Sequence, residues 1–417
     1  MNLIYVVSIQ AFKGRLWDDI PRGKIVGLID EEYVVKLLRN LVQIPSINPP
    51  GDYNEISSFI IDEIKSYGLD VQIFEHYKDR PNIVCSLKNS RSEPTLLIDA
   101  HFDTVPPYNL EKWKYDPFSA KIVDGAMFGR GTTDCKGCLA AMMAATKALV
   151  EADCDLQGNL LLVAWADDEW RPKDSLWFNG ESYLAKNKLI TADMAIFGEP
   201  YDLKVIYMSK GRVWFEFNVE GKACHSAAEG GVNAIVKALK LVESIYSLKL
   251  GTHPIAGKDT INVGTIRGGD QTNMVPDWCT LSFDIRFSPP LTATTVEQKV
   301  TRKLKELKTN VPDFVLKSVK TTQKIDPIEC PIDAQVIKAL MKAGGTVLGK
   351  APELGGAVSF GDVAEWKELI GLKEFCMFGP GALDQAHAIN EHILINDLIT
   401  ATKMYALAAF NSLRSEA

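Results

Sequence analysis

The segment Thr95-Leu96-Leu97-Ile98-Asp99-Ala100-His101 decides the fold of this chain. Its first six residues are mostly apolar, as in a strand that is covered on both faces, and a polar side chain follows at once. The apolar runs Asn159–Ala166 and Met194–Phe197 end in the same way, and a helical segment, Cys135–Glu151, lies between the first two. This alternation of strands and helices predicts an α/β fold with a mostly parallel, helix-covered sheet.

Acidic and histidine residues stand at the ends of these elements. They are His101-Phe102-Asp103, Asp134, Asp167-Asp168-Glu169, Glu199 and His387. Since the loops at the carboxyl ends of parallel strands converge on one crevice, we expect five of these side chains to meet there: His101, Asp134, Glu169, Glu199 and His387. Imidazole and carboxylate ligands without thiolate suit zinc, with cobalt or manganese as alternatives. A site for two metal ions needs one bridging carboxylate and two further ligands for each ion, and these five residues meet that number.

A second kind of pattern begins near Met208, where strands alternate polar and apolar residues. The order of segments from there is strand, helix, strand, strand, helix, strand, which is the layout of a ferredoxin-like domain. The strand Glu374–Phe378 and two flanking helical segments then return to the first pattern. We therefore expect a domain at 208–322 inserted into a catalytic domain formed by 1–207 and 323–417, with residues 1–27 as an extension of unknown role.

Composition excludes several classes of partner. The chain has 417 residues, 46% of them hydrophobic, and a net charge of −7 that is spread along its length. Neither nucleic acid nor an anionic membrane is an expected partner. The longest apolar runs fall short of the roughly 20 residues that span a bilayer, and the apolar run Leu3–Val7 is too short for a signal peptide. We expect the protein to work in the cytoplasm.

The cysteines support the same compartment. Eight of them are scattered through the chain, mostly beside apolar residues, as expected of reduced thiols in a core. Cys135 and Cys138 form the one Cys-x-x-Cys pair. Because an alanine-rich helical segment follows and no second pair stands at zinc-ribbon spacing, we assign this pair to packing rather than to redox or metal chemistry.

From about Asp30 onward the chain resembles a known family of dinuclear zinc hydrolases. This family includes acetylornithine deacetylase, succinyl-diaminopimelate desuccinylase, aminoacylase and carboxypeptidase G. The strings that carry the resemblance are His101-Phe102-Asp103-Thr104-Val105-Pro106, Gly129-Arg130-Gly131-Thr132-Thr133-Asp134-Cys135-Lys136-Gly137, Gly198-Glu199-Pro200, Gly221-Lys222-Ala223-Cys224-His225-Ser226-Ala227, Asn273-Met274-Val275-Pro276, Gly379-Pro380-Gly381 and His387-Ala388-Ile389-Asn390-Glu391.

The resemblance implies roles for the residues at the metal site. Asp134 would bridge two zinc ions, His101 and Glu199 would complete one of them, and Glu169 and His387 the other. Asp103 would fix the imidazole of His101.

The resemblance also implies roles for residues outside the metal site. The inserted domain would form a homodimer and act as a lid, and His225 would reach the neighbouring subunit's site to stabilise an oxyanion. Asn273 and Arg286 would bind the substrate carboxylate, Arg286 by a two-point hydrogen bond. Gly379 and Gly381 would form a wall of the substrate pocket.

The chain departs from the family at one catalytic position. The general base of the family is a glutamate directly before the metal-binding glutamate, and here that position is Asp168. The carboxyl group is the same, but its stem is shorter by one carbon, about 1.5 Å. A displacement near 1 Å costs on the order of a hundredfold in rate, so either the backbone compensates or the enzyme is slow.

The leading hypothesis is a zinc-dependent hydrolase that removes the acyl group from an N-acyl amino acid. Asp168 would carry the proton from the attacking water to the leaving amine. A dipeptidase or carboxypeptidase of the same family is the alternative, because its substrates also present an amide near a carboxylate. A protein that binds metal and an amino-acid derivative with little or no turnover is the third reading.

Overall fold

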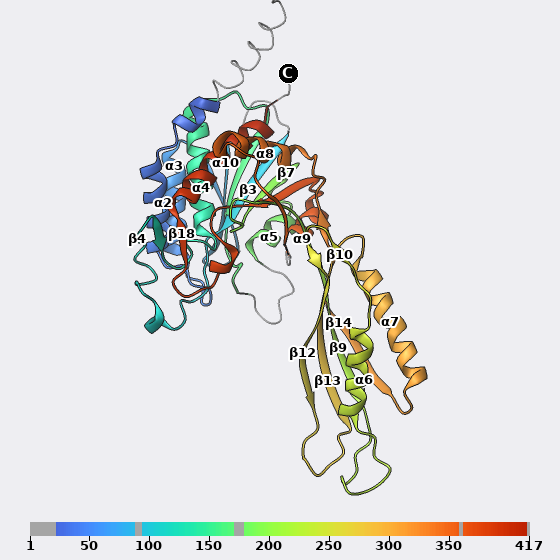
Figure 1. Cartoon of the computed structure of the whole chain (residues 1–417). Coiled ribbons are helices and arrows are strands. Elements are labelled where there is room, and N and C mark those ends of the chain that lie inside the picture. The colour runs from blue at the N-terminus through green and yellow to red at the C-terminus, as the bar shows by residue number, and fades with distance from the viewer. Residues whose placement is uncertain (1–21, 88–93, 171–178, 358–361, 415–417) are drawn as a thin grey trace, which may run out of the picture. The chain divides into compact units, whose positions relative to one another are not determined.

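The chain divides into two compact units (Figure 1). The first contains Met1–Tyr207, Cys330–Leu354 and Glu365–Ala417, and the second contains Met208–Glu329 and Gly355–Ala364. The computed structural model describes residues 22–87, 94–170, 179–357 and 362–414, so most of the expected extension 1–27 lies outside the described residues. The second unit runs seven residues past the expected boundary at 322, because β14 (Val315–Ile325) and β15 (Ile328–Glu329) continue it.

The first unit is built on one large sheet. Its strand order is β1-β2-β6-β3-β7-β17-β8-β15, and β16 also pairs with β8. The boundary between the two units falls within β8. The strands are β1 Val71–Tyr77, β2 Arg80–Leu87, β3 Thr95–His101, β6 Asn159–Trp165, β7 Met194–Gly198, β8 Val205–Ser209, β16 Leu354–Ala357 and β17 Glu374–Phe378. A small separate sheet contains β4 Lys121–Val123, β5 Ala126–Phe128 and β18 His392–Leu394.

The strands at the centre of the large sheet pair in parallel. Strands β6, β3, β7 and β17 are parallel to one another, whereas β2 and β8 run against them. Two residues join β1 to β2, and such a short connection can link only antiparallel neighbours. The predicted α/β class is confirmed, and the sheet is mixed. The four central strands match the parallel part of the prediction.

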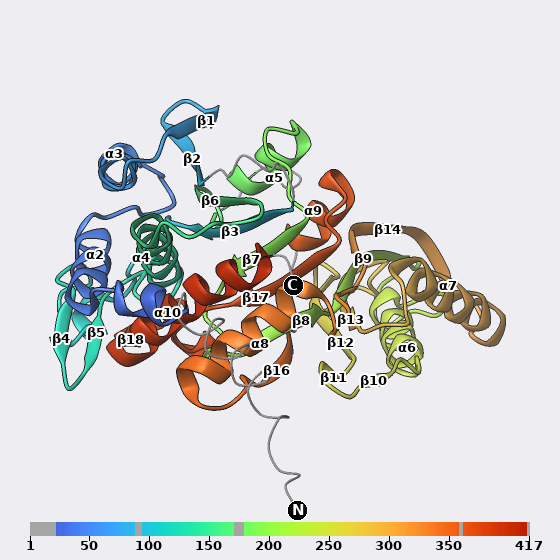
Figure 2. The ribbon, with the colours of Figure 1, turned by 90° about the horizontal axis from the view of Figure 1, so that it is seen from above.

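Helices cover both faces of this sheet, with α4, α8 and α10 on one face and α5 and α9 on the other (Figure 2). Gly198 at the end of β7 lies against Met142 of α4, and its neighbour Phe197 packs against Trp366 of α9 on the opposite face. The helices are α2 Glu31–Gln43, α3 Asn54–Ser66, α4 Lys136–Ala152, α5 Gly180–Lys186, α8 Gln335–Leu348, α9 Asp362–Ile370 and α10 Ile395–Ser412, and single 3-10 turns lie at Leu110–Lys112 and Leu383–Gln385.

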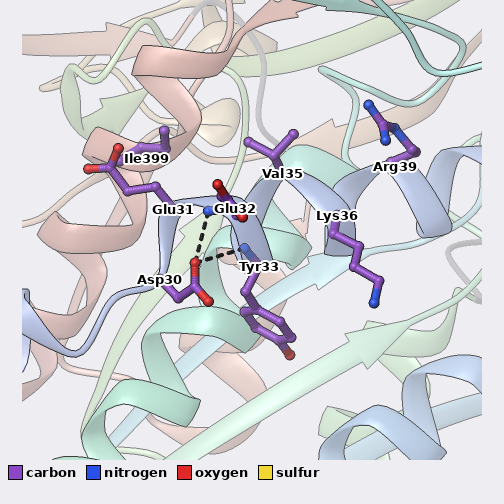
Figure 3. A pocket seen from close by; sticks show the side chains of 8 residues that line it. All are labelled: Asp30, Glu31, Glu32, Tyr33, Val35, Lys36, Arg39 and Ile399. Carbon is purple, nitrogen blue, oxygen red and sulfur yellow. Dashed lines mark hydrogen bonds between the residues drawn. The ribbon is translucent and has the colours of Figure 1, made fainter.

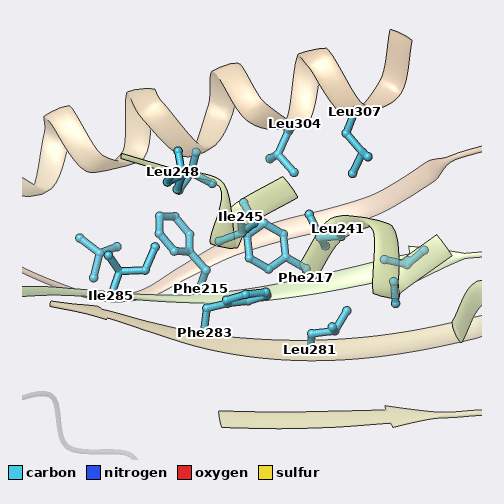
Figure 4. Close-up of a cluster of buried hydrophobic side chains, with 14 of the residues drawn as sticks. Phe215, Phe217, Leu241, Ile245, Leu248, Leu281, Phe283, Ile285, Leu304 and Leu307 are labelled. Atoms are coloured by element: carbon cyan, nitrogen blue, oxygen red, sulfur yellow. The ribbon is translucent and has the colours of Figure 1, made fainter. Parts of the chain in front are cut away.

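The second unit has the ferredoxin-like layout that the sequence predicts. Its elements are β9 Gly211–Glu220, α6 Ala234–Tyr246, the small hairpin β10 Thr252–His253 and β11 Gly257–Lys258, β12 Thr260–Gly268, β13 Trp278–Phe287, α7 Ala293–Asn310 and β14. The four-stranded sheet has the order β12-β13-β9-β14, and α6 and α7 pack on one face of it (Figure 4). Alternate residues of β9 and β13 point into this core, because side chains alternate between the faces of a strand.

None of the helices within the described ranges is both long and apolar enough to cross a membrane.

The core of the second unit supplies a stability prediction. The fully buried Phe217 packs edge-to-face on Phe283, with ring centroids 5.4 Å apart. We expect Phe217→Ala to lower the free energy of unfolding by about 3 to 5 kcal/mol, because it leaves a cavity. Urea unfolding followed by circular dichroism measures the change. Val319→Ala in the same unit, where the side chain is 47% exposed, is the control and should shift it by about 0.5 kcal/mol at most. A Phe217→Ala effect no larger than the control would contradict the packing.

Candidate metal centre and active site

The candidate site lies at the carboxyl ends of the four central strands. His101 is the last residue of β3, the segment Asp167-Asp168-Glu169 follows β6, and Glu199 follows β7 directly. His387 lies in the loop after β17, and Asp134 stands two residues before α4. Because parallel strands present their carboxyl ends to one edge, these loops lie on the same side of the first unit.

Asp134 lies between the two histidines. Its Oδ1 is 3.1 Å from His101 Nε2, and its Oδ2 is 3.3 Å from His387 Nε2. His387 Nε2 is also 2.8 Å from Glu169 Oε2. The ligand-type atoms of Asp134, Glu169 and His387 lie within 4.8 Å of one another. The carboxylate of Asp134 therefore offers one oxygen to each side of the cluster.

Glu199 adds a further buried carboxyl group next to this cluster. Burial raises the pKa of Glu199 well above its ordinary value, and repulsion from Asp134 raises it further. Among the described residues, Glu199 belongs to neither of the two groups whose ligand-type atoms lie within 4.8 Å of one another.

The cluster has three carboxyl groups, those of Asp134, Glu169 and Glu199, for its two imidazoles. Burial and then repulsion from Asp134 raise the pKa of Glu169 to about 8. Hydrogen bonds with Asp134 and Glu169 raise the pKa of His387 to about 10. Burial would lower the pKa of His101, but hydrogen bonds with Asp103 and Asp134 raise it well above its ordinary value. Buried carboxylates that need positive charge to ionise are what a cation site requires.

Asp103 holds two parts of the site in place. It is fully buried, and its carboxylate accepts hydrogen bonds from the backbone N–H groups of Asp168 and Glu169, each at 3.1 Å. His101 Nδ1 lies 3.1 Å from the main-chain oxygen of Asp103 and 3.5 Å from Oδ1. Asp103 therefore orients His101 and also fixes the backbone that carries Asp168.

The shorter side chain of Asp168 still reaches the site. Its Oδ2 lies 4.0 Å from His101 Nε2, on the nitrogen that faces Asp134, and the side chain is 27% exposed. A carboxylate that is partly open to water and next to the ligand cluster has the position that a general base needs.

Asp167, which the sequence did not single out for a role, anchors the same loop. Its Oδ1 accepts hydrogen bonds from Tyr53 Oη at 2.6 Å and from Asn48 Nδ2 at 3.1 Å, and it forms an ion pair with Arg80. Its backbone φ of 72° lies in the left-handed region, which aspartate tolerates better than most residues. The position of Asp167 directly before Asp168 was the only sequence signal for this role.

Cys135, which the sequence assigned to packing, also lies close to the site. Its Sγ belongs to a group with His101 and Asp134 whose ligand-type atoms lie within 4.8 Å of one another. The thiol is fully buried, donates to the carbonyl oxygen of Gly198 at 2.9 Å, and has its pKa raised well above the ordinary value by burial. A neutral thiol that is used in a hydrogen bond agrees with the packing role. Its place next to Asp134 in the sequence was the signal for its closeness to the site.

Positions 379 and 381 have no room for a side chain, because neighbouring atoms lie too close to their backbone. A Cβ at Gly379 would lie 2.5 Å from both Cys138 Sγ and the carbonyl oxygen of Glu199. Gly381 has a φ of 84°, and a Cβ there would lie 2.9 Å from Thr133 Cγ2. The turn after β17 therefore packs on the backbone beside Glu199 and on the loop that carries Asp134.

His225 and Asn273 lie together in the second unit. The backbone N–H of Ser226 donates to the carbonyl oxygen of Asn273 at 2.9 Å, and His225 forms an isolated bridge with Met274. His225 Nδ1 accepts a hydrogen bond from the backbone of Ala227 at 3.1 Å, which leaves Nε2 as the nitrogen for other contacts. Both residues follow the ends of strands, His225 after β9 and Asn273 after β12.

Arg286 lies at the other end of the same sheet. It is eight residues along β13 from Trp278, which is about 27 Å at the usual rise of a strand, and Trp278 pairs with Glu220 at the end that leads to His225. Arg286 uses its Nε and Nη2 on both carboxylate oxygens of Asp284, at 2.8 to 3.1 Å. The expected two-point contact is thus made with Asp284 in this structure.

A solvent-open depression of about 640 Å³ lies elsewhere in the first unit, along α2 (Figure 3). The side chains around it include Glu31, Lys36, Arg39 and Ile399, and the Asp30 carboxylate caps the helix by accepting from the backbone of Glu32 and Tyr33. None of the predicted site residues lines it. Charged side chains of both signs are ordinary on the solvent-exposed surface of a helix, so this depression gives no reason to expect a ligand.

Known proteins that resemble this chain include metal-dependent hydrolases, which agrees with a cluster of candidate metal ligands. Residues 97–411 match the sequence profile of the peptidase family M20/M25/M40. The chain is 28% identical to an uncharacterized metallohydrolase of Methanococcus maripaludis, over 91% of this chain and 98% of that protein. It is also 28% identical to the acetylornithine deacetylase of Proteus mirabilis, over 86% of this chain and 91% of that protein.

A solved structure has the same fold. The aminopeptidase PepT of Bacillus cereus superposes with a TM-score of 0.73 and 21% identity, over 93% of this chain and 99% of that one. The family profile covers most of the chain, and the resemblance noted in the sequence is confirmed. The chain therefore belongs to the peptidase family M20/M25/M40 and is a metallohydrolase.

Proposed function

We propose that this protein is a two-metal hydrolase that cleaves the amide bond of an N-acyl amino acid. The observation that carries the proposal is the position of Asp134, whose two oxygens face two different imidazoles, those of His101 and His387. A carboxylate shared between two sets of nitrogen and oxygen ligands is the arrangement that a pair of ions about 3.5 to 4 Å apart needs.

The donor set fits such a pair. Glu169 Oε1 is buried and has no hydrogen-bond partner among the described residues. Because buried polar atoms normally have a partner, this oxygen is a candidate metal ligand. In the proposed assignment Asp134 is shared, His101 and Glu199 hold one ion, and Glu169 and His387 hold the other. Imidazole and carboxylate donors favour zinc, with cobalt or manganese as alternatives.

The residues around the ions would carry the proton transfers. Metal ions held by these residues would polarise the amide carbonyl and lower the pKa of water. As the water oxygen bonds to the carbonyl carbon, Asp168 takes its proton, and it then gives a proton to the nitrogen as the carbon–nitrogen bond breaks. The products are a carboxylic acid and a free amine. Asp103 keeps Asp168 in reach by binding its backbone N–H.

The second unit supplies the proposed substrate contacts. Arg286 and Asn273 are the candidates for the carboxylate of the amino acid, and His225 for the oxyanion that forms on the carbonyl. Arg286 lies about 27 Å along β13 from Trp278, which pairs with Glu220 at the end of the sheet that leads to His225. One small substrate therefore cannot contact both Arg286 and His225 in the same chain. We therefore propose that His225 and Asn273 serve the site of a second copy.

The surface of the second unit supports a homodimer. Val236, Leu239 and Tyr246 on α6 are between 49 and 51% exposed, and Ile266 on the edge strand β12 is 47% exposed. Apolar side chains beside an open strand edge are a surface that a second copy can cover. All eight cysteines are free, which supports the proposal that the enzyme works in the reducing cytoplasm.

Substrate class is tested with the purified, metal-replete protein. We expect release of the amine from acetylornithine or succinyl-diaminopimelate, measured with a primary-amine reagent, and metal analysis should give two zinc, cobalt or manganese ions per chain. Cleavage of dipeptides alone would favour the peptidase reading, which the same site chemistry allows. Bound metals with no cleavage of any of these compounds would favour the metal-binding reading. A protein without these metals would contradict the proposal.

The base position is tested by two changes at Asp168. Asp168→Asn should lower kcat by about 10² to 10⁴-fold because the proton acceptor is lost, while metal content stays at the wild-type value. Asp168→Glu should leave kcat unchanged or lower it, since the backbone contacts of this loop are already fitted to the shorter side chain. A large gain in kcat for Asp168→Glu would instead identify a wild-type enzyme that is limited by its base.

The shared site is tested by mixing two inactive variants. His225→Ala should lower kcat by about 10² to 10³-fold through loss of oxyanion stabilisation. In a heterodimer with Asp168→Asn, one site has an intact Asp168 and receives an intact His225. After random subunit exchange in an equal mixture, about a quarter of wild-type activity should return. Activity of the mixture no higher than that of the separate variants would contradict the exchange of His225 between subunits.

A further inference from the structure

Two loops that carry proposed metal ligands run side by side in the first unit. Strand β5 leads into the loop that ends at Asp134, and β18 follows the loop that contains His387. These two strands pair with each other. Beyond the paired strands, the backbone N–H of Gly129 donates to the carbonyl oxygen of Glu391 at 2.9 Å. The backbones of the two loops are therefore hydrogen-bonded to each other.

The side chain of Glu391 strengthens this connection. It is fully buried, and its Oε1 accepts from the backbone N–H groups of Thr133 at 2.8 Å and Asp134 at 3.1 Å. Its Oε2 accepts from the backbone of Gly131 at 3.0 Å and from Arg130 Nη1 at 2.6 Å. A carboxylate has about four acceptor positions, so these contacts occupy the whole group.

Arg130 extends the connection to the other ligand loop. Its Nη1 pairs with Glu391, while its Nη2 donates to the carbonyl oxygen of His387 at 3.3 Å. The guanidinium lies 5.3 Å from the ring centroid of Trp113, in the position of a cation–π contact. The buried pair of Arg130 and Glu391 therefore forms hydrogen bonds with the backbone of both Asp134 and His387.

We propose that Glu391 is a positioning residue for the metal centre, which sets the distance between Asp134 and His387 by binding the backbone of the Asp134 loop directly and the carbonyl oxygen of His387 through Arg130. This inference rests on the proposed function only in taking these two residues as ligands. The contacts to Asp134 are made at its own N–H, so a shift of Glu391 moves the shared carboxylate directly. Support of this kind typically changes metal affinity by about 10 to 100-fold when it is removed.

The chemistry of the carboxylate explains why a neutral side chain of the same shape cannot replace it. Glutamine at this position would offer one oxygen and one NH₂ group, and the NH₂ would face N–H donors where the second oxygen now accepts. In one orientation of the amide the Gly131 N–H and the Arg130 guanidinium would lose an acceptor, and in the other the N–H groups of Thr133 and Asp134 would lose theirs. Both loops would have to move apart or admit water to satisfy these groups.

The experiment measures metal binding of full-length Glu391→Gln and Glu391→Asp by competition with a zinc chelator, together with metal content and thermal unfolding after metal removal. We expect Glu391→Gln to bind at least one of its two zinc ions about 10 to 100-fold more weakly than wild type. Glu391→Asp, which keeps the charge, should recover part of that loss.

Glu374→Gln is the matched control. This carboxylate accepts a hydrogen bond from the backbone N–H of Val336 at 3.2 Å, at the start of β17 and therefore at the opposite edge of the sheet from the site. It should leave zinc affinity unchanged. Wild-type zinc affinity in folded Glu391→Gln, or equal losses in Glu391→Gln and Glu374→Gln, would overturn the proposal.

Arg130→Lys covers the case in which Glu391→Gln does not fold. Lysine keeps the charge but cannot bind Glu391 and the His387 carbonyl with a planar fork, so we expect weaker zinc binding with normal circular dichroism. Unchanged zinc affinity in both Arg130→Lys and Glu391→Asp would also overturn the proposal. Because zinc binding is measured without substrate, a wild-type protein that binds two ions but cleaves nothing would contradict the proposed function and leave this test intact.

Discussion

The parallel pairing of β6, β3, β7 and β17 is the constraint on which the site depends. It brings the residues after each strand to one edge, although those residues come from positions as far apart as 101 and 387. Packing on both faces keeps the strands in register, since Gly198 fits against α4 while Phe197 packs on α9. A one-residue slip of β7 would turn Gly198 and Phe197 to the wrong faces.

The strands bring the loops near one another, and buried carboxylates then fix their backbones. Asp103 binds two N–H groups of the loop with Asp168, and Glu391 binds three in the loop with Asp134. Asp167, next to Asp168, binds the side chains of Asn48, Tyr53 and Arg80. Asp103 and Glu391 supply acceptors to loop N–H groups that no neighbouring strand binds, and Asp167 attaches its own loop to other segments of the chain. The rigidity of the site thus comes from residues that never need to touch the substrate.

The sequence predicted the long regular elements well because apolar periodicity defines them locally. The strands Trp278–Phe287 and Glu374–Phe378 have the bounds that their patterns indicate. It missed β2 and β8, because a run with Pro81 and a five-residue strand have little periodicity. The roles of Asp167 and Glu391 were also missed. Their partners are 87 to 261 positions away in the chain, and nothing local distinguishes such an acidic residue from a solvated one.

The two histidines of the proposed centre differ greatly in their access to water, since the side chain of His101 is 1% exposed and that of His387 is 56% exposed. An ion held beside His387 would have one ligand that is open to solvent, whereas an ion beside His101 would have a buried one. Exchange kinetics would therefore be unequal at the two positions.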